Sequence, residues 1–163
     1  MISEPRIETR DAQPYVGIRA NLAMKDFPSV IDRTLGELWA WVGEHGLRQE
    51  AGPPVFRYLT IGDDGVMEIE FCIPLADPAP GDERVRAGTL PDGRYATLLH
   101  TGHYDGLRDA TARLVQWGDQ QGVQWDKDAS GVWRARLETY LTDPSAEPDA
   151  SKWQTQLAIL IAD

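Results

Sequence analysis

The sequence predicts an α+β fold in which the order strand, helix, strand, strand occurs twice. Two alignments of the chain with itself indicate this. Residues 41–47 (Trp-Val-Gly-Glu-His-Gly-Leu) align without a gap with residues 117–123 (Trp-Gly-Asp-Gln-Gln-Gly-Val), and residues 15–18 (Tyr-Val-Gly-Ile) align with residues 95–98 (Tyr-Ala-Thr-Leu). Each pair occupies the same place in the order of elements, as expected of an internal duplication.

We predict one domain over residues 1–163, with pseudo-twofold halves at about 1–76 and 83–163. One helix and three strands are too few to enclose a core or a ligand. Two halves side by side would form a longer antiparallel sheet with both helices on one face. The other face would remain curved and open, and we expect a ligand cleft there, between the related halves.

The first half contains one helix and a hairpin. Asp26 and Pro28 are typical of a helix start, and Gly46 is typical of a helix end. Between them, apolar residues recur at the spacing of one helical face: Ile31, Leu35, Leu38 and Val42. Strands are expected at 55–61 and 66–75, joined by a Gly- and Asp-rich turn.

The second half repeats this pattern. Residues 84–100 read as extended, with a break at 90–93 that contains Pro and Gly. A helix is expected from about Asp105, and Gly122 should end it as Gly46 ends the first helix. Closing strands are expected at 132–141 and 153–161.

The strand expected at 132–141 has two different faces. Ala135 and Leu137 belong to an apolar face that we expect to pack on a helix. Glu138 and Tyr140 lie two residues apart and therefore point together from the opposite face. For an arbitrary strand, the simplest interpretation of the second face is that solvent covers it.

Charge and composition exclude several classes of partner. The formal net charge is −10 and the pI is near 4.7, which argues against nucleic acid and against anionic membrane surfaces. The single cysteine, Cys72, cannot form an internal disulfide. The N-terminus lacks the layout of a secretion signal, and no apolar run is long enough to span a bilayer. We expect a cytoplasmic protein.

No motif indicates a metal or a cofactor. His100, His103 and Asp105 are close in sequence, but no thiol or further acid cluster supports a metal site. There is no glycine-rich phosphate loop and no serine in a nucleophile elbow. We therefore predict that the chain uses no cofactor.

The order of several short motifs resembles the GyrI-like family, also called the AraC-type effector-binding domain. The motifs are Met-Glu-Ile at 67–69, Gly-His-Tyr at 102–104, Glu-Thr-Tyr-Leu-Thr-Asp-Pro at 138–144 and Trp-Gln-Thr at 153–155. The resemblance covers essentially the whole chain. One departure is Ile-Leu-Ile at 159–161, where the family often has a proline.

The resemblance implies a pocket for bulky, aromatic and often cationic small molecules, with Glu138 at its base. It also implies an alternative, because some stand-alone members are similar to hydrolases that open the cyclopropane ring of DNA-alkylating natural products. In that alternative Glu138 and Tyr104 would be catalytic. We favour a binding protein over an enzyme. A transcription regulator on another chain is a further partner that the resemblance allows, and the oligomeric state stays open.

Further pocket candidates are aromatic, and each has a simpler interpretation. Trp41 lies off the main stripe of its helix and could be core or pocket rim, whereas Trp39 and Trp117 fit core positions. The predicted ligand-binding residues are Glu138, Tyr140, Tyr104, Trp41, Tyr58, Phe71 and Trp153. Tyr104 could instead be a hydrophobic staple at a helix start, and Phe71 could be a core residue.

Overall fold

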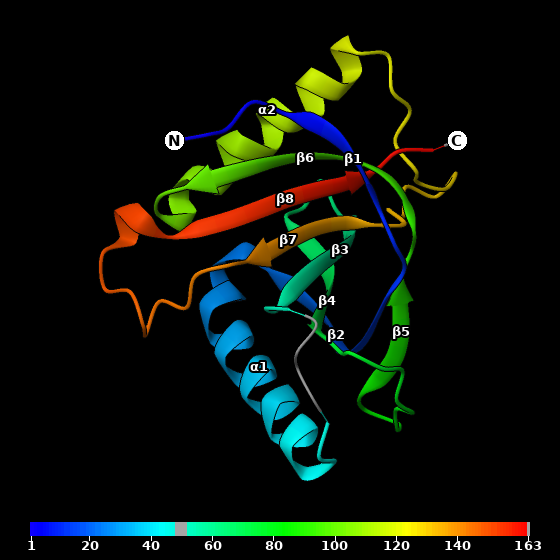
Figure 1. Ribbon diagram of the computed structural model, residues 1–163, viewed down its shortest axis with the longest axis vertical. Helices are drawn as coiled ribbons and strands as arrows, with labels where there is room; N and C mark the ends of the chain where they lie inside the picture. Colours follow the sequence, from blue (N-terminus) through cyan, green and yellow to red (C-terminus); the bar gives the residue numbers. More distant parts are fainter. Residues whose placement is uncertain (48–51, 163) are drawn as a thin grey trace.

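The computed structural model describes residues 1–47 and 52–162, which form one antiparallel sheet, two α-helices and three short 3-10 helices. The strands run in the order β1-β6-β8-β7-β3-β4-β2-β5 (Figure 1). Their bounds are β1 Arg6–Arg10, β2 Gln13–Ala23, β3 Val55–Ile61, β4 Val66–Pro74, β5 Arg86–Leu90, β6 Gly93–Thr101, β7 Arg136–Tyr140 and β8 Gln154–Leu160. The helices are η1 Met24–Asp26, α1 Phe27–Glu44, η2 Tyr104–Gly106, α2 Leu107–Gln120 and η3 Ala150–Lys152.

The predicted α+β fold with duplicated halves is confirmed. The first half is β2-α1-β3-β4 and the second is β6-α2-β7-β8. They join where β3 pairs with β7, and there Phe56 lies directly opposite Glu138. The strand before each half is exchanged: β1 pairs with β6, and β5 pairs with β2.

Both helices end in the way their glycines predict. Gly46 has φ +62° and Gly122 has φ +76°, left-handed conformations that suit glycine. In each case the next N–H returns to the helix: Leu47 N donates to Val42 O and Val123 N donates to Gly118 O, both at 3.1 Å. In the part of the chain that the structure describes, neither helix has the length and apolarity needed to cross a membrane.

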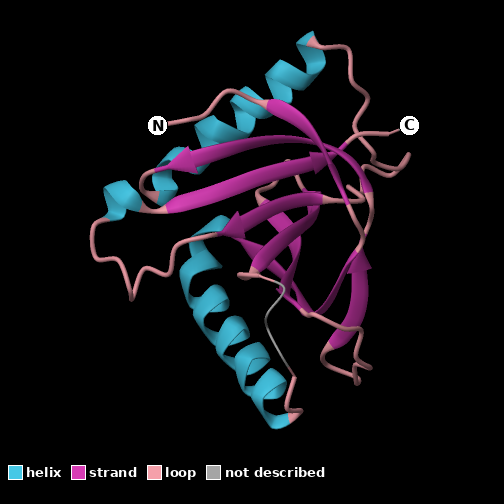
Figure 2. Ribbon diagram, viewed as in Figure 1, coloured by secondary structure: helices cyan, strands magenta, loops and turns pink. Residues whose placement is uncertain are grey.

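The sheet curls (Figure 2), and apolar side chains pack into a core on each of its faces. On the helix-bearing face, α1 packs over β2 and β4, and α2 packs over β6. Val16, Ile18 and Ile73 meet Leu38 and Val42 there. The inner, concave face has its own core from both halves: Tyr15, Val55, Cys72, Leu90, Tyr95, Ala135, Leu137, Ala158 and Leu160.

The two faces of β7 are reversed relative to the expectation from sequence. Ala135 and Leu137 pack into the core of the concave face and not against a helix. Glu138 and Tyr140 therefore point toward the helix-bearing face, where Tyr140 packs against residues of both halves. Alternation identified the two faces of the strand correctly, but the curl of the sheet provides an apolar core on each side.

Candidate functional site

A carboxylate with two tyrosines lies on the helix-bearing face, where β3 meets β7. The hydroxyl groups of Tyr58 and Tyr140 both donate to Glu138 Oε1, at 2.6 Å and 2.5 Å. No residue in the described ranges donates a hydrogen bond to the other carboxylate oxygen, Oε2. The side chain is only partly exposed. This leaves one carboxylate oxygen available to a cation or a donor.

Aromatic rings pack around Tyr140, one of the two partners of this carboxylate. Tyr104, at the start of η2, meets the ring of Tyr140 edge to face at 5.5 Å between centroids. It also packs against Trp153 at 4.8 Å. On the other side, Phe56 lies 4.5 Å from Tyr140 and 4.7 Å from Phe71. We call Glu138 and the rings of Phe56, Tyr58, Tyr104, Tyr140 and Trp153 the aromatic cluster.

Desolvation dominates the electrostatics of the cluster. It raises the pKa of Glu138 above its ordinary value, while the two tyrosine hydroxyls and the charge of Arg136 oppose this shift. Burial, reinforced by the neighbouring carboxylate, raises the pKa values of Tyr58 and Tyr140 well above 10. Both phenols thus remain hydrogen-bond donors at neutral pH.

Arg136 shares the strand face of Glu138 but stacks elsewhere. Its guanidinium lies over the ring of Trp133, 4.8 Å from the centroid. Desolvation lowers the pKa of Arg136, and the charge of Glu138 opposes that shift. Arg136 therefore acts on Glu138 as a nearby charge, while the two phenols are its direct partners.

The structure brings five of the seven predicted site residues into the cluster. Hydrogen bonds and ring contacts link them in one series, from Tyr58 to Glu138, Tyr140, Tyr104 and Trp153. This places them on the helix-bearing face and not on the open face where the cleft was expected.

The other two predicted site residues have different positions. Phe71 is fully buried and lies directly opposite Phe56 on the neighbouring strand β4, where its ring meets that of Phe56 edge to face. Trp41 is buried among the residues that join α1 to β2. Its indole N–H donates to Asp82 at 2.7 Å and its ring stacks on His45. Trp41 is thus a core residue of the first half, away from Glu138.

Sequence reasoning missed two phenylalanines. Phe56 lies directly opposite Glu138, and Phe27, at the start of α1, has its ring 6.2 Å from that of Phe56. The alternation in 55–61 places Phe56 on the same face as the predicted Tyr58 and could have identified it. Nothing in the sequence links Phe27 to this face, because the contact depends on where α1 begins over the sheet.

Two histidines lie near η2, His100 buried and His103 exposed. Within the described residues, no group of three or more His, Cys, Asp or Glu side chains is arranged to hold a metal ion. His103 lies beside the cluster, with its ring 5.6 Å from that of Trp153. His100 is buried beneath η2, and its Nε2 lies 3.0 Å from the carbonyl oxygen of His103.

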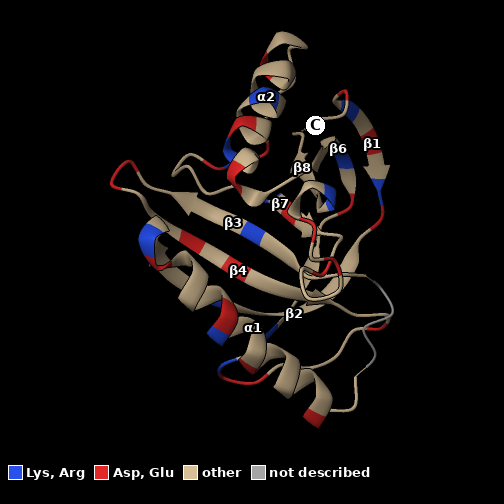
Figure 3. Ribbon diagram, turned by 90° about the vertical axis from the view of Figure 1, so that its left-hand side faces the viewer, with Lys and Arg blue, Asp and Glu red and all other residues tan. Residues whose placement is uncertain are grey.

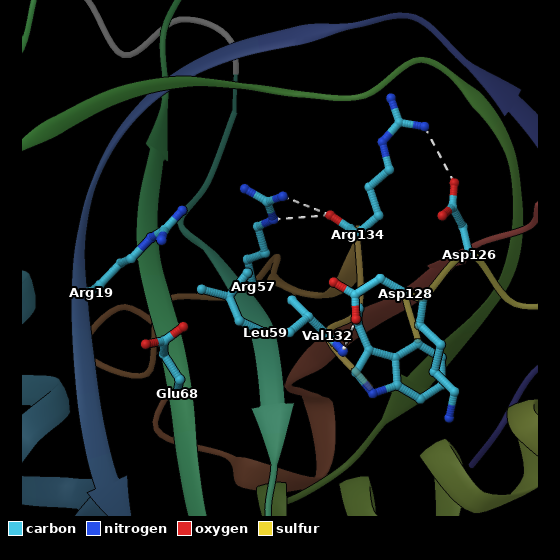
Figure 4. Close-up of a pocket in the computed structure, with 10 residues that line it drawn as sticks. Arg19, Arg57, Leu59, Glu68, Asp126, Asp128, Val132 and Arg134 are labelled. Atoms are coloured by element: carbon cyan, nitrogen blue, oxygen red, sulfur yellow. Dashed lines mark hydrogen bonds and ion pairs between the residues drawn. The ribbon is translucent and has the colours of Figure 1, made fainter. Parts of the chain in front are cut away.

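The concave face carries a hollow of about 370 Å³ (Figure 4). Four basic side chains line it (Arg19, Arg57, Lys127 and Arg134), and so do three acidic ones (Glu68, Asp126 and Asp128). None of the predicted site residues is among them. A hollow therefore exists on the face where the cleft was expected, but its chemistry is ionic instead of aromatic.

The charges in this hollow are largely paired within the protein. Arg57 donates to the carbonyl oxygen of Arg134, to Tyr15 and to the buried Glu70. Arg19 also reaches Glu70, at 3.4 Å. Arg134 pairs with Asp126 at 3.2 Å. Elsewhere acidic and basic positions are interspersed along the helices and loops (Figure 3). The aromatic cluster, with an undonated carboxylate oxygen, is the stronger candidate site.

The fold is thus an α+β domain on a curled antiparallel sheet, with an acid that is hydrogen-bonded to two tyrosines. The sequence profile of the GyrI-like small molecule binding domain matches residues 3–162. The chain belongs to this family. No curated protein sequence matches it.

Solved structures share the fold at low sequence identity. The EcmrR chain in an EcmrR–DNA complex has a TM-score of 0.83 at 20% identity; the match covers 98% of this chain and 57% of that one. The EcmrR C-terminal domain has a TM-score of 0.75 at 16% identity, covering 98% of each chain. SAV2435 bound to tetraphenylphosphonium has a TM-score of 0.66 at 13% identity, covering 98% of this chain and 94% of that one. At these identities the likeness establishes the fold alone.

Proposed function

We propose that this domain binds bulky, hydrophobic, aromatic cations at the aromatic cluster, with Glu138 as the countercharge. The observation that carries the proposal is the asymmetric carboxylate. Both tyrosine hydroxyls donate to Oε1, and no described residue donates to Oε2. A desolvated carboxylate with one unused oxygen is costly in the free protein, and a cation beside it offsets that cost.

The rings supply the remaining attraction. A cation over an aromatic face is attracted by about 0.5–2 kcal/mol, and offset or edge-to-face ring pairs contribute about 0.5–1.5 kcal/mol beyond the area they bury. Tyr104 and Trp153 are half-buried and pack mainly on each other and on Tyr140. A bulky ligand takes their present place, and they become its outer wall. The phosphonium bound to SAV2435, a protein of the same fold, supports this ligand class.

The test compares a cation with a neutral molecule of similar rings. Tetraphenylphosphonium and triphenylphosphine oxide are titrated against the wild type and Glu138→Gln by calorimetry. The substitution should weaken the phosphonium by about 1.5–3 kcal/mol, the range for a hydrogen bond or contact to a charged group. The neutral oxide should bind with nearly the same affinity to both proteins.

The affinity for the phosphonium should also fall at acid pH. Because the pKa of Glu138 is raised above its ordinary value, protonation removes the countercharge at a pH above 4.5. The cation favours the ionised carboxylate, so its binding should release a proton. Equal losses for the two ligands in Glu138→Gln would mean that Glu138 shapes the binding site without acting as a countercharge.

A second candidate is a hydrolase of reactive cyclopropanoid compounds. Two phenols within 2.6 Å of a carboxylate of raised pKa can serve proton transfer. Two solved structures of this fold carry the description of a hydrolase from Listeria innocua, at TM-scores of 0.63 and 0.64 and 14% and 13% identity. Incubation with a cyclopropanoid followed by mass spectrometry separates the two functions. Stoichiometric intact ligand indicates a binder, and hydrated product in excess over protein indicates an enzyme.

A further inference from the structure

Two buried polar atoms near the aromatic cluster have no partner. They are His100 Nδ1 and Thr155 Oγ1, and among the described residues no other enclosed side-chain nitrogen or oxygen is without one. His100 is 5% exposed and Thr155 is 0% exposed. A buried polar group left unpaired costs about 1–3 kcal/mol. Such groups in native proteins therefore call for an explanation.

The two atoms belong to one place in the sheet. His100 on β6 and Thr155 on β8 are directly opposite each other, so their side chains share the helix-bearing face. Thr155 also lies opposite Tyr140 of β7. The three side chains form a row across neighbouring strands: Tyr140, Thr155, His100. The row starts in the aromatic cluster and ends beneath η2.

The first half of the chain shows that the fold does not require a polar pair here. In the first half, Ile69 takes the place of Thr155 and Ala20 takes the place of His100. These two residues also lie opposite each other, on β4 and β2. Both of those side chains are apolar and pack with the core under α1. The same architecture is thus stable with an apolar pair, and the polar pair needs a reason other than folding.

The hydrogen bonds of His100 define what this pair can accept. Its Nε2 lies 3.0 Å from the carbonyl oxygen of His103, which can only accept, so Nε2 carries the proton. In the neutral ring Nδ1 is then an acceptor. The hydroxyl of Thr155, opposite His100 on the neighbouring strand, can donate. A group that both donates and accepts at one oxygen, a hydroxyl, complements the pair.

The 3-10 helix η2 packs closely over the side chain of His100. A Cβ at Gly106 would come within 2.5 Å of the imidazole Cε1, so η2 fits tightly against the ring. The residue after His103 in this loop is Tyr104, which packs against both Tyr140 and Trp153. Tyr104 therefore lies between the aromatic cluster and the loop that covers His100.

We propose that His100 and Thr155 form a polar subsite that takes a hydroxyl group at the inner end of the aromatic cluster. The subsite rests on the proposed function, because a ligand bound at the aromatic cluster brings the hydroxyl to it. The hydroxyl belongs to water in the free protein and to a phenol or alcohol of the ligand in the complex. The domain then prefers hydroxylated aromatic ligands over their unsubstituted counterparts.

The test uses phenol and toluene, which match in size and carry no charge. Both are titrated against ¹⁵N-labelled protein, and the ring nitrogens of His100 are followed in long-range ¹H–¹⁵N spectra, with His100→Gln used for assignment. Phenol should shift the Nδ1 resonance, and toluene should leave it in place. Thr155→Val should weaken phenol about fivefold, the loss expected of one hydrogen bond. Thr155→Ser keeps the hydroxyl and should preserve the response.

Thr97→Val is the matched control. Thr97 is a buried threonine on β6, but it lies opposite Ala158, whose side chain packs in the core of the concave face. The Thr97→Val substitution should leave phenol binding unchanged. If phenol leaves the Nδ1 resonance of the wild-type protein unchanged, His100 and Thr155 hold only a water molecule. That result would overturn the subsite. Because neither probe is charged, a failure of tetraphenylphosphonium to bind overturns the proposed function and leaves the phenol result standing.

Discussion

At the scale of single residues, Glu138 combines a proposed role in recognition with a cost to the folded state. Its carboxylate accepts hydrogen bonds from two phenols on one oxygen. Burial raises its pKa, which means that the folded protein holds this proton more tightly than the unfolded chain does. A residue chosen for stability alone would not be an acid at this position.

The pH dependence of stability should reveal this cost. A raised folded-state pKa gives a contribution that is present below the unfolded pKa and is lost as pH rises through the folded pKa. Glu138→Gln should therefore match the wild type at about pH 4 and exceed it at about pH 7.5, by on the order of 1 kcal/mol. Urea unfolding at both pH values measures the difference. The exposed Glu44→Gln controls for the change in net charge, and a variant less stable than wild type at the higher pH would contradict the desolvation argument.

Tyr104 should matter for binding more than for folding. It is half-buried at the start of η2, and its partners are other rings of the cluster. Tyr104→Ala should weaken tetraphenylphosphonium at least about tenfold, the sum expected of one stacking and one cation–π contact. Trp39→Ala removes another half-buried ring, packed on a different core, and should leave the affinity unchanged. If Tyr104→Ala instead lowers the melting temperature sharply and affinity per folded molecule is constant, Tyr104 is a core residue.

At the scale of elements, the two helices resemble each other in sequence but use their glycines differently. A methyl group added to Gly43 of α1 would have no neighbouring atom within 4 Å. In α2, a methyl group on Gly118 would collide with the ring of Trp125. The loop after α2 folds back over the helix at this point, and Trp125 lies against Gly118.

Matched alanine substitutions test this difference. Gly43→Ala should raise the free energy of unfolding by about 0.5–1 kcal/mol, because alanine loses less backbone entropy in a helix. Gly118→Ala should lower it by about 1–3 kcal/mol, the cost of overpacking. Chemical denaturation of the two variants gives both values. A gain in stability from Gly118→Ala would mean that Trp125 moves away freely.

The elements were largely predictable from sequence because their signals are local. The strand at 55–61 was predicted with the observed bounds, and both glycine caps fall where expected. The strand expected at 132–141 is shorter in the structure, Arg136–Tyr140. Trp133 forms only an isolated bridge to Lys127. The alternation of apolar and polar residues continues beyond the ends of β7. The strand itself ends where its pairing with β3 and β8 ends.

At the scale of the whole molecule, the two halves are interlocked. Each half receives its edge strand from the segment that precedes the other half, since β1 pairs with β6 and β5 pairs with β2. The core of the concave face draws Tyr15 and Val55 from one half and Tyr95 and Leu160 from the other. Neither half can bury its own apolar residues alone.

Unfolding should therefore be a single transition. Urea curves followed by tryptophan fluorescence and by far-UV circular dichroism should coincide, because both halves lose their shared core together. Residues 83–163 produced alone should show no cooperative unfolding. Two separated transitions, or a stable isolated half, would show that the halves fold independently.

The sequence by itself determined the duplication, the caps and the pairing of Glu138 with Tyr140 on one strand face. These follow from local periodicity, which the chain carries in every window of a few residues. The resemblance to the GyrI-like family added the expectation of an acid at the base of a pocket. Phe56 was within reach of the same reasoning, because it alternates with its neighbours as Tyr58 does.

Only the tertiary structure decided which face of the sheet holds these residues. Alternation along the sequence distinguishes the two faces of β7, but it does not say what packs against each face. Here an apolar core lies on both faces. The curl of the sheet placed Ala135 and Leu137 in the concave core. Contacts between segments far apart in sequence then joined Tyr58 to Glu138 across 80 positions. Side chains at that separation meet through strand order and register, which no local pattern in the sequence specifies.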